Sequence, residues 1–166
     1  MTSSKENFAD YPRQLRSRTQ EPFSVYELST DRFAVHRTKT DARSSSGDDV
    51  SLQDGEDLIE VVEGKPKGET APETNGPVYT TGGAQAIPTG LVFLRFGDGT
   101  KIAERADDIE GAGYEIARTI EYAANAGWLR HRSGSMAKSL TGISDLEKIR
   151  GVENVEPQML MRRVSR

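Results

Sequence analysis

Nucleophilic catalysis in this chain would have to use serines together with its two histidines, His36 and His131, because the sequence contains no cysteine. A serine, a histidine and an aspartate can form a hydrolytic triad. No serine here, however, stands in the G-x-S-x-G sequence of a nucleophile elbow. His131 lies between Arg130 and Arg132, a pattern typical of a solvated strand edge. We therefore expect no catalytic residue and no enzymatic activity.

The sequence predicts neither a cofactor nor a metal ion. Without cysteine there are no thiolate ligands and no disulfides, and two histidines are too few for a histidine-rich metal cluster. The stretch Gly97-Asp98-Gly99-Thr100 lacks the Lys-Ser/Thr pair of a phosphate-binding loop and predicts a turn. Asp107 and Asp108 are adjacent, so they diverge on a helix and indicate a solvated face rather than paired carboxylates.

The last six residues are the candidate binding site. They show no helical stripe and follow the last strand that the pattern predicts. One interpretation is a frayed terminus. The other is an extended peptide that adds as a strand to a groove in another protein. The pattern alone leaves both open. The residues are Met161, Arg162, Arg163, Val164, Ser165 and Arg166.

Composition and charge narrow the possible partners. Hydrophobic residues make up 34% of the chain, so part of it is expected to be disordered. Residues 1–90 carry 10 basic and 15 acidic side chains, and residues 91–166 carry 12 and 11, so neither half suits a general nucleic-acid binder. No apolar run reaches membrane-spanning length, and the N-terminus lacks a signal-peptide core. We expect a soluble, cytoplasmic protein with no nucleic-acid or membrane partner.

The first 76 residues predict little stable structure. We expect a disordered arm over residues 1–20, which are polar and have no apolar period, and a small β-rich segment over residues 21–76. Alternating stretches at residues 23–28 and 32–37, separated by a turn at Ser29-Thr30-Asp31, predict a hairpin. The composition of residues 38–76 predicts a mobile loop over residues 38–56, a short strand over 57–62 and a linker over 64–76.

Residues 77–160 are far better patterned and predict one folded domain. An apolar run at residues 91–96 predicts a central strand, and apolar residues at helical spacing predict a helix over 102–109. The order of elements is β-α-β-β-α-β, which predicts an α+β, ferredoxin-like split βαββαβ fold with a four-stranded antiparallel sheet and two helices on one face. The remaining strands are predicted over residues 114–122 and 126–131, followed by an extended stretch over 152–164. Between them a helical stripe begins at Met136, and a capping box at Ser144–Glu147 marks the start of a second helical segment.

Two binding modules share this order of elements. An RNA-recognition module would use stacking aromatic residues, but Phe93 and Phe96 are three residues apart and point to opposite faces of one strand. The basic-Gly-aromatic signature of that family is also missing. A ferredoxin-like ligand-sensing domain, or a protein-assembly module, stays open because its sites have no local motif.

The segment from Val78 to Arg166 resembles the N-terminal pro-domain of subtilisin-like serine proteases, the subtilisin-propeptide inhibitor family. The matching pieces are an opening strand at residues 92–96 followed by Gly-Asp-Gly, the helix end at residues 109–114 and a central hairpin at residues 122–128. The most specific piece is Leu146 to Pro157, with its closing Gly-Val-x-x-Val-Glu-Pro. The resemblance covers about half of the chain. Residues 21–81 loosely resemble a β-rich segment that precedes the pro-domain in some bacterial subtilases.

The resemblance implies a partner and a role. Such a pro-domain is an intramolecular chaperone and a serine protease inhibitor, whose sheet packs on the protease and whose C-terminal peptide lies in the substrate groove like a product. It would place Met161 to Arg166 in that groove as protease-binding residues. The protease domain of the family, with its Asp, His and Ser motifs, is missing from the sequence. The resemblance therefore implies a stand-alone, propeptide-like inhibitor without peptidase activity.

Overall fold

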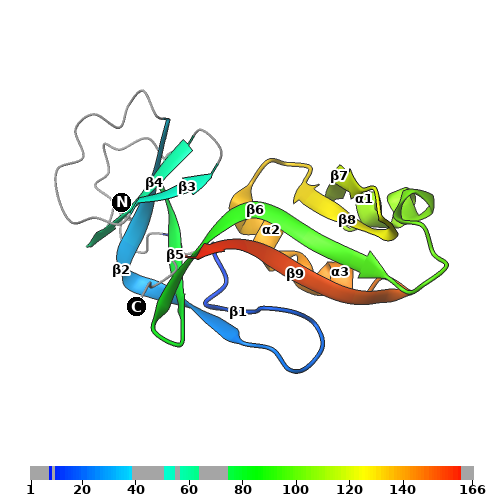
Figure 1. The fold of residues 1–166 in the computed structure, drawn as a ribbon, viewed down its shortest axis with the longest axis horizontal. Coiled ribbons are helices and arrows are strands. Elements are labelled where there is room, and N and C mark those ends of the chain that lie inside the picture. Colours follow the sequence, from blue (N-terminus) through cyan, green and yellow to red (C-terminus); the bar gives the residue numbers. More distant parts are fainter. Residues whose placement is uncertain (1–7, 9, 39–50, 55–56, 64–74, 162–166) are drawn as a thin grey trace. The chain divides into compact units, whose positions relative to one another are not determined.

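The computed structural model describes residue 8 and residues 10–38, 51–54, 57–63 and 75–161. The described residues form mostly antiparallel β-sheet with short helices (Figure 1). The chain divides into two compact units. Unit 1 contains residues 1–9, 27–87 and 159–166, and unit 2 contains residues 10–26 and 88–158. The loop expected over residues 39–50 and the linker expected over 64–74 lie outside the described residues.

Unit 1 is built on an antiparallel sheet with the strand order β3-β4-β2-β5-β6. A two-residue turn joins β5 to β6, where Thr81 lies opposite Ala84. The turn residues Gly82 and Gly83 have φ angles of 55° and 86°, which a type I′ hairpin turn requires and glycine adopts without strain. The strands are β2 (Val25–Thr38), β3 (Ser51–Asp54), β4 (Asp57–Glu63), β5 (Asn75–Thr81) and β6 (Ala84–Phe96).

A small apolar cluster stabilises unit 1. Ala34, Val78 and Ile87 come from three strands and are fully buried, and Leu160 packs against them. Burial of a side chain the size of isoleucine contributes about 1.5–3 kcal/mol. The cluster therefore joins strands that are far apart in the sequence.

The hairpin predicted over residues 23–28 and 32–37 is wrong. Both stretches belong to one strand, β2, and Ser29 to Asp31 continue it without a turn. The pairing of β2 with β5 shifts in register between Leu28 and Phe33, and this irregularity takes up the predicted turn residues. Because β2 has β4 along one edge and β5 along the other, backbone hydrogen bonds to both neighbours outweigh the local turn preference.

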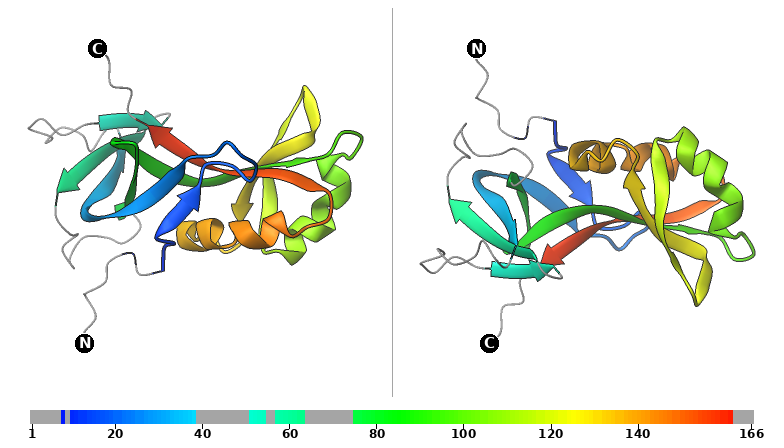
Figure 2. Two further views of the ribbon diagram at one scale, coloured as in Figure 1. Left: turned by 90° about the horizontal axis from the view of Figure 1, so that it is seen from below. Right: turned by 90° about the horizontal axis from the view of Figure 1, so that it is seen from above.

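Unit 2 is a sheet with helices on one face. Its strand order is β9-β6-β8-β7, with β6 central and shared with unit 1. Figure 2 shows helices α2 and α3 on one side of this sheet. The elements are β1 (Gln14–Arg16), η3 (Ile102–Arg105), α1 (Ala106–Gly111), β7 (Tyr114–Ile120), β8 (Ala123–His131), α2 (Met136–Thr141), α3 (Ile143–Glu147) and β9 (Val152–Met161).

Alternate residues of the central strands form the core of unit 2. Val92, Leu94 and Phe96 of β6 are fully buried, and so are Ile109 of α1 and Leu146 of α3. Because side chains alternate between the faces of a strand, every second residue of β6 meets the helices. The core also contains Ile102, Tyr114, Leu129 and Val155.

The predicted ferredoxin-like split βαββαβ fold is wrong as a description of this protein. The helices and strands of residues 91–161 lie near their expected places, but the described strands form one larger, mostly antiparallel sheet of nine strands and not a separate four-stranded sheet. The predicted strand at residues 91–96 begins at Ala84, and its first residues pair with β5. Ala86, Ile87 and Pro88 are buried, so the strand already contributes to the core before its predicted start at residue 91. The sheet thus continues past the boundary that the periodicity implied.

The prediction of a disordered arm does not describe residues 10–20. Residues 14–16 form strand β1, which pairs with β2, and Leu15 is only 7% exposed. A single leucine in a polar stretch gives no periodic signal, so the sequence pattern could not reveal this packing. Residues 1–7 and 9 of the predicted arm lie outside the described residues.

Replacing Leu15 with alanine tests whether the N-terminal segment is part of unit 2. We expect Leu15→Ala to lower the free energy of unfolding by about 2 kcal/mol, because it removes a buried side chain and leaves a void. Arg13→Ala, at an exposed position two residues away, is the matched control and should change stability by less than about 0.5 kcal/mol. Urea unfolding monitored by circular dichroism measures both. Equal stability of the two variants would mean that the segment does not pack.

Candidate functional site

The structure places one of the six predicted tail residues. Met161 is the last residue of β9 and is 42% exposed. The other five, Arg162 to Arg166, lie outside the described residues. The described part of the candidate site is therefore the strand that leads to the tail.

Strand β9 is held at several points along its length. It pairs with β6. At its start the amide of Gly97 donates a hydrogen bond to the carbonyl of Gly151, at 3.1 Å. Further along, the hydroxyl of Thr89 donates to the side-chain oxygen of Gln158 at 2.7 Å. The predicted Gly-Val-x-x-Val-Glu-Pro sequence thus forms a fixed strand before Met161.

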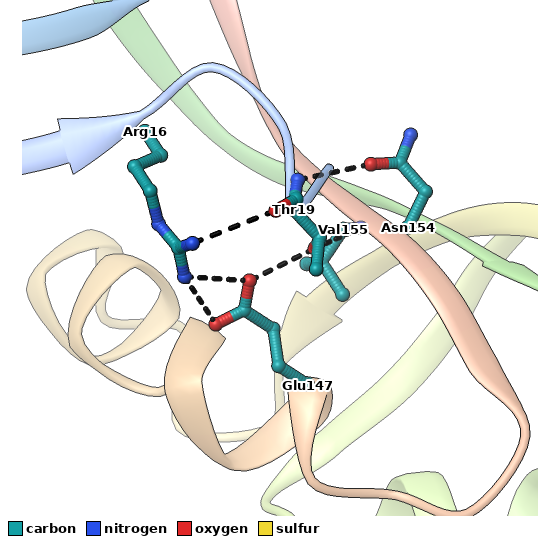
Figure 3. A network of polar contacts seen from close by, with 5 residues as sticks. All are labelled: Arg16, Thr19, Glu147, Asn154 and Val155. Atoms are coloured by element: carbon teal, nitrogen blue, oxygen red, sulfur yellow. Dashed lines mark hydrogen bonds and ion pairs between the residues drawn. The ribbon is translucent and has the colours of Figure 1, made fainter. Parts of the chain in front are cut away.

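A polar network, which we call the N-terminal clamp, covers the edge of β9 (Figure 3). It consists of Arg16, Thr19, Glu147, Asn154 and Val155. The hydroxyl of Thr19 donates to Glu147 Oε2 at 2.8 Å and accepts the amide hydrogen of Val155 at 2.9 Å. The amide of Thr19 donates to Asn154 Oδ1 at 3.1 Å. The clamp satisfies an edge amide of β9 that would otherwise be free for strand addition.

Glu147 links the clamp to helix α3. Arg16 Nη2 donates to both of its carboxylate oxygens, at 3.0 and 3.1 Å. The Arg16 side chain is 46% exposed, so this ion pair contributes at most about 1 kcal/mol. The Thr19 bonds are partly buried and matter more, because unmaking them would leave polar groups without partners.

An open groove of about 540 Å³ lies beside the clamp, within unit 2. Leu15 and Phe23 from the N-terminal segment and Leu140 and Ile143 from the helices supply its apolar lining. The charged residues that line it, Arg16 and Glu147, are paired with each other. The groove therefore offers apolar surface without an unpaired charge.

The face of the unit 2 sheet opposite the helices has a different character. We call it the basic–aromatic face, and it carries Phe93, Arg95, Glu115, Arg118, Trp128 and Arg130. Phe93 lies directly opposite Trp128 across β6 and β8, with ring centroids 5.3 Å apart and an interplanar angle of 64°. Arg118 of β7 lies opposite Trp128 on its other side. Cross-strand partners share a face, so these three form one row.

A β-bulge brings Arg118 to this face. Ile116 pairs with Leu129, and Arg118 pairs with the next residue, Trp128, so Ala117 is an extra residue in β7. Strict alternation from buried Tyr114 and partly buried Ile116 would have turned Arg118 toward the helices. The bulge reverses that, as bulges commonly do. The sequence pattern alone could not place Arg118 on this face, because a period of two cannot reveal a bulge.

His131 contacts a nearby serine within a local turn. Its Nδ1 lies 2.7 Å from Ser133 Oγ and accepts the Ser133 amide hydrogen at 3.2 Å, so the contact is a local turn. Within the described residues, no carboxylate contacts this ring. Its ring lies 5.2 Å from that of Tyr114, edge to face. Burial, and then the positive charge of Lys138, hold the pKa of His131 below its usual value.

The described residues show neither a group of metal-ligating side chains nor a helix that could cross a membrane. Among them, no three His, Cys, Asp or Glu side chains are grouped so that they could hold a metal ion. In the same part of the chain, no helix has the length and apolar character needed to cross a membrane. Comparison of the chain with known protein families, curated proteins and solved structures found no match.

Removing the hydroxyl of Thr19 tests the clamp. We expect Thr19→Val to lower the free energy of unfolding by about 1–3 kcal/mol, because the Val155 amide and the Glu147 carboxylate each lose a partner. The matched control is Thr119→Val at an exposed position of β7, where a change within about 0.5 kcal/mol is expected. Hydrogen exchange should also become faster at Val155. An unchanged exchange rate there would contradict the clamp.

The pKa of His131 predicts how stability depends on pH. Because that pKa is lower in the folded than in the unfolded protein, the unfolded state binds more protons as the pH falls below about 6.5. This contribution to stability is complete above pH 6.5 and is lost as the pH falls through the folded-state pKa. The urea midpoint should therefore fall from pH 7.5 to 5.0 in the wild type.

Carboxylates also titrate at low pH and change the stability of the wild type. The variant His131→Gln lacks the imidazole, so the difference between the two proteins isolates the contribution of His131. Its urea midpoint should fall less than that of the wild type over the same pH range. Identical pH dependence in the two proteins would show that His131 is not the group responsible.

Proposed function

We propose that this protein is a stand-alone, propeptide-like inhibitor of a subtilisin-like serine protease, acting in the cytoplasm. Residues Met161 to Arg166 bind in the substrate groove of the protease in the manner of a cleaved product. The protein performs no chemistry of its own. Assisting the folding of the same protease is a second activity within the proposal.

The observation that carries the proposal is strand β9. It contains the sequence from Val152 to Pro157 on which the family resemblance chiefly rests. Hydrogen bonds with Thr89 and Thr19 hold it, and it ends at the exposed Met161. A tail that continues from an ordered strand loses less conformational entropy on binding than the same peptide free in solution.

The proposed mechanism separates affinity from specificity. Backbone groups of the extended tail add as a strand to the groove and supply affinity for any protease of this class. Alternate side chains enter pockets and supply specificity, with Arg166 or a neighbouring residue in the primary pocket. The folded body raises the effective concentration of the tail at the groove, so a weakly binding peptide becomes a strong inhibitor.

Deleting Met161 to Arg166 tests the proposal. We expect inhibition of the cognate subtilisin-like protease to weaken by about 100-fold or more, because the effective-concentration gain needs tail and body together. The control is deletion of residues 1–7, which should leave inhibition unchanged. Inhibition constants measured with a chromogenic peptide substrate compare the two. Undiminished inhibition by the truncated protein would refute the tail mechanism.

A refolding experiment separates inhibition from chaperone activity. Denatured protease that lacks its own pro-domain is diluted into buffer with and without this protein, and active enzyme is titrated after the inhibitor has been removed. Recovery only in its presence would establish the chaperone activity.

A further inference from the structure

Strand β9, from which the proposed tail continues, ends in unit 1. Its residues Val152 to Gln158 belong to unit 2, whereas Met159 to Met161 belong to unit 1. Its neighbour β6 likewise contributes residues to both units, and the two strands are drawn in red and green in Figure 1. The tail therefore starts from the unit that lies mostly outside the segment that resembles a pro-domain.

Leu160 packs this end of β9 onto the core of unit 1. It is half-buried and contacts Ala34, Val78 and Ile87, whose side chains are fully buried. These three residues come from β2, β5 and β6. All four residues belong to unit 1, so the contact forms within one compact body.

The packing of Leu160 also orients the residue that follows it. Neighbouring side chains of a strand point to opposite faces. Because Leu160 faces the apolar cluster, Met161 points away from that cluster, which agrees with its 42% exposure. The contact thus sets the direction of the first residue of the proposed binding tail.

A fixed starting point raises the affinity of a tail for its groove. A residue released from the strand has to be ordered again on binding, and fixing one backbone corresponds to about 5-fold or more in a binding constant. Release also lengthens the flexible segment between the folded body and the groove, which lowers the effective concentration of the tail. Loss of the Leu160 contact would have both effects without removing any residue of the tail.

We propose that Leu160 is a positioning residue of the inhibitor: its packing against Ala34, Val78 and Ile87 holds the start of the tail in the orientation in which it binds. This inference rests on the proposed function and gives unit 1 a part in it. The resemblance to a pro-domain assigns no role to Ala34 or to the rest of unit 1 before Val78. Inhibition therefore depends on an apolar contact in the core of unit 1.

Shortening Leu160 tests the inference. We expect Leu160→Ala to weaken inhibition of the cognate protease by about 5-fold or more, although Met161 to Arg166 are all present. Leu160→Met, which keeps the apolar volume, should inhibit within about 2-fold of the wild type. The matched control is Ile149→Ala, which truncates a half-buried side chain packed against the core of unit 2 and should change inhibition by less than about 2-fold.

Val78→Ala tests the same contact from the side of unit 1. It removes a partner of Leu160 and no part of the tail, and it should weaken inhibition by about 3-fold or more. The double variant should lose less than the product of the two single effects, because both substitutions remove one contact. A loss equal to that product would contradict the contact. Thermal unfolding verifies that each variant is folded, and Leu160→Val, with the same direction of effect, replaces Leu160→Ala if that variant does not fold.

A measurement without protease reports the packing itself. The backbone order parameter of Met161, obtained from nitrogen relaxation, should fall in Leu160→Ala and keep its wild-type value in Ile149→Ala. An order parameter unchanged by Leu160→Ala would overturn the inference, since the start of the tail would then be held without Leu160.

The outcomes distinguish the two proposals. If the full chain inhibits no member of a panel of subtilisin-like proteases, the proposed function fails, and this inference fails with it. If the full chain inhibits a protease but Leu160→Ala inhibits as well as Ile149→Ala does, the function stands and the positioning role is refuted. If removal of the tail and Leu160→Ala both weaken inhibition while Ile149→Ala does not, both proposals stand.

Discussion

The pairing of β8 with β6 on one side and β7 on the other determines which side chains of unit 2 face the core and which face outward. Once Val92 lies opposite Leu129, alternate residues of β6 and β8 are committed to the helix-covered core and the others to the open face. This register, together with the bulge at Ala117 in β7, produces both the apolar core and the row formed by Phe93, Trp128 and Arg118. A slip of one residue would exchange the two faces, burying arginine and exposing leucine.

Strand β9 depends on residues far away in the sequence. Its inner neighbour is β6, and its outer edge is covered by Thr19, whose hydroxyl bonds to Val155 and Glu147. The edge of a sheet offers unpaired backbone groups to any other strand. The hydroxyl of Thr19 occupies one such group, the amide of Val155, within the chain, and strand addition is proposed for the tail that follows the exposed Met161.

The sequence by itself determined where most elements of residues 91–161 lie, because apolar residues at periods of two and near four are set by which side chains must be buried. It also supplied the resemblance on which the proposed function rests. Local patterns did not reveal the fold class, the single strand β2 or the packing of Leu15, all of which depend on pairing between distant segments.

Of the candidate residues, the sequence singled out the tail, but not the basic–aromatic face of unit 2. Phe93 and Trp128 are 35 positions apart, and only the strand register places them in contact. Arg118 reaches that face through a bulge at Ala117, which periodicity cannot foresee. Local sequence records which residues prefer burial. Which buried and exposed residues become neighbours is decided by backbone hydrogen bonds between strands, and these form only in the folded chain.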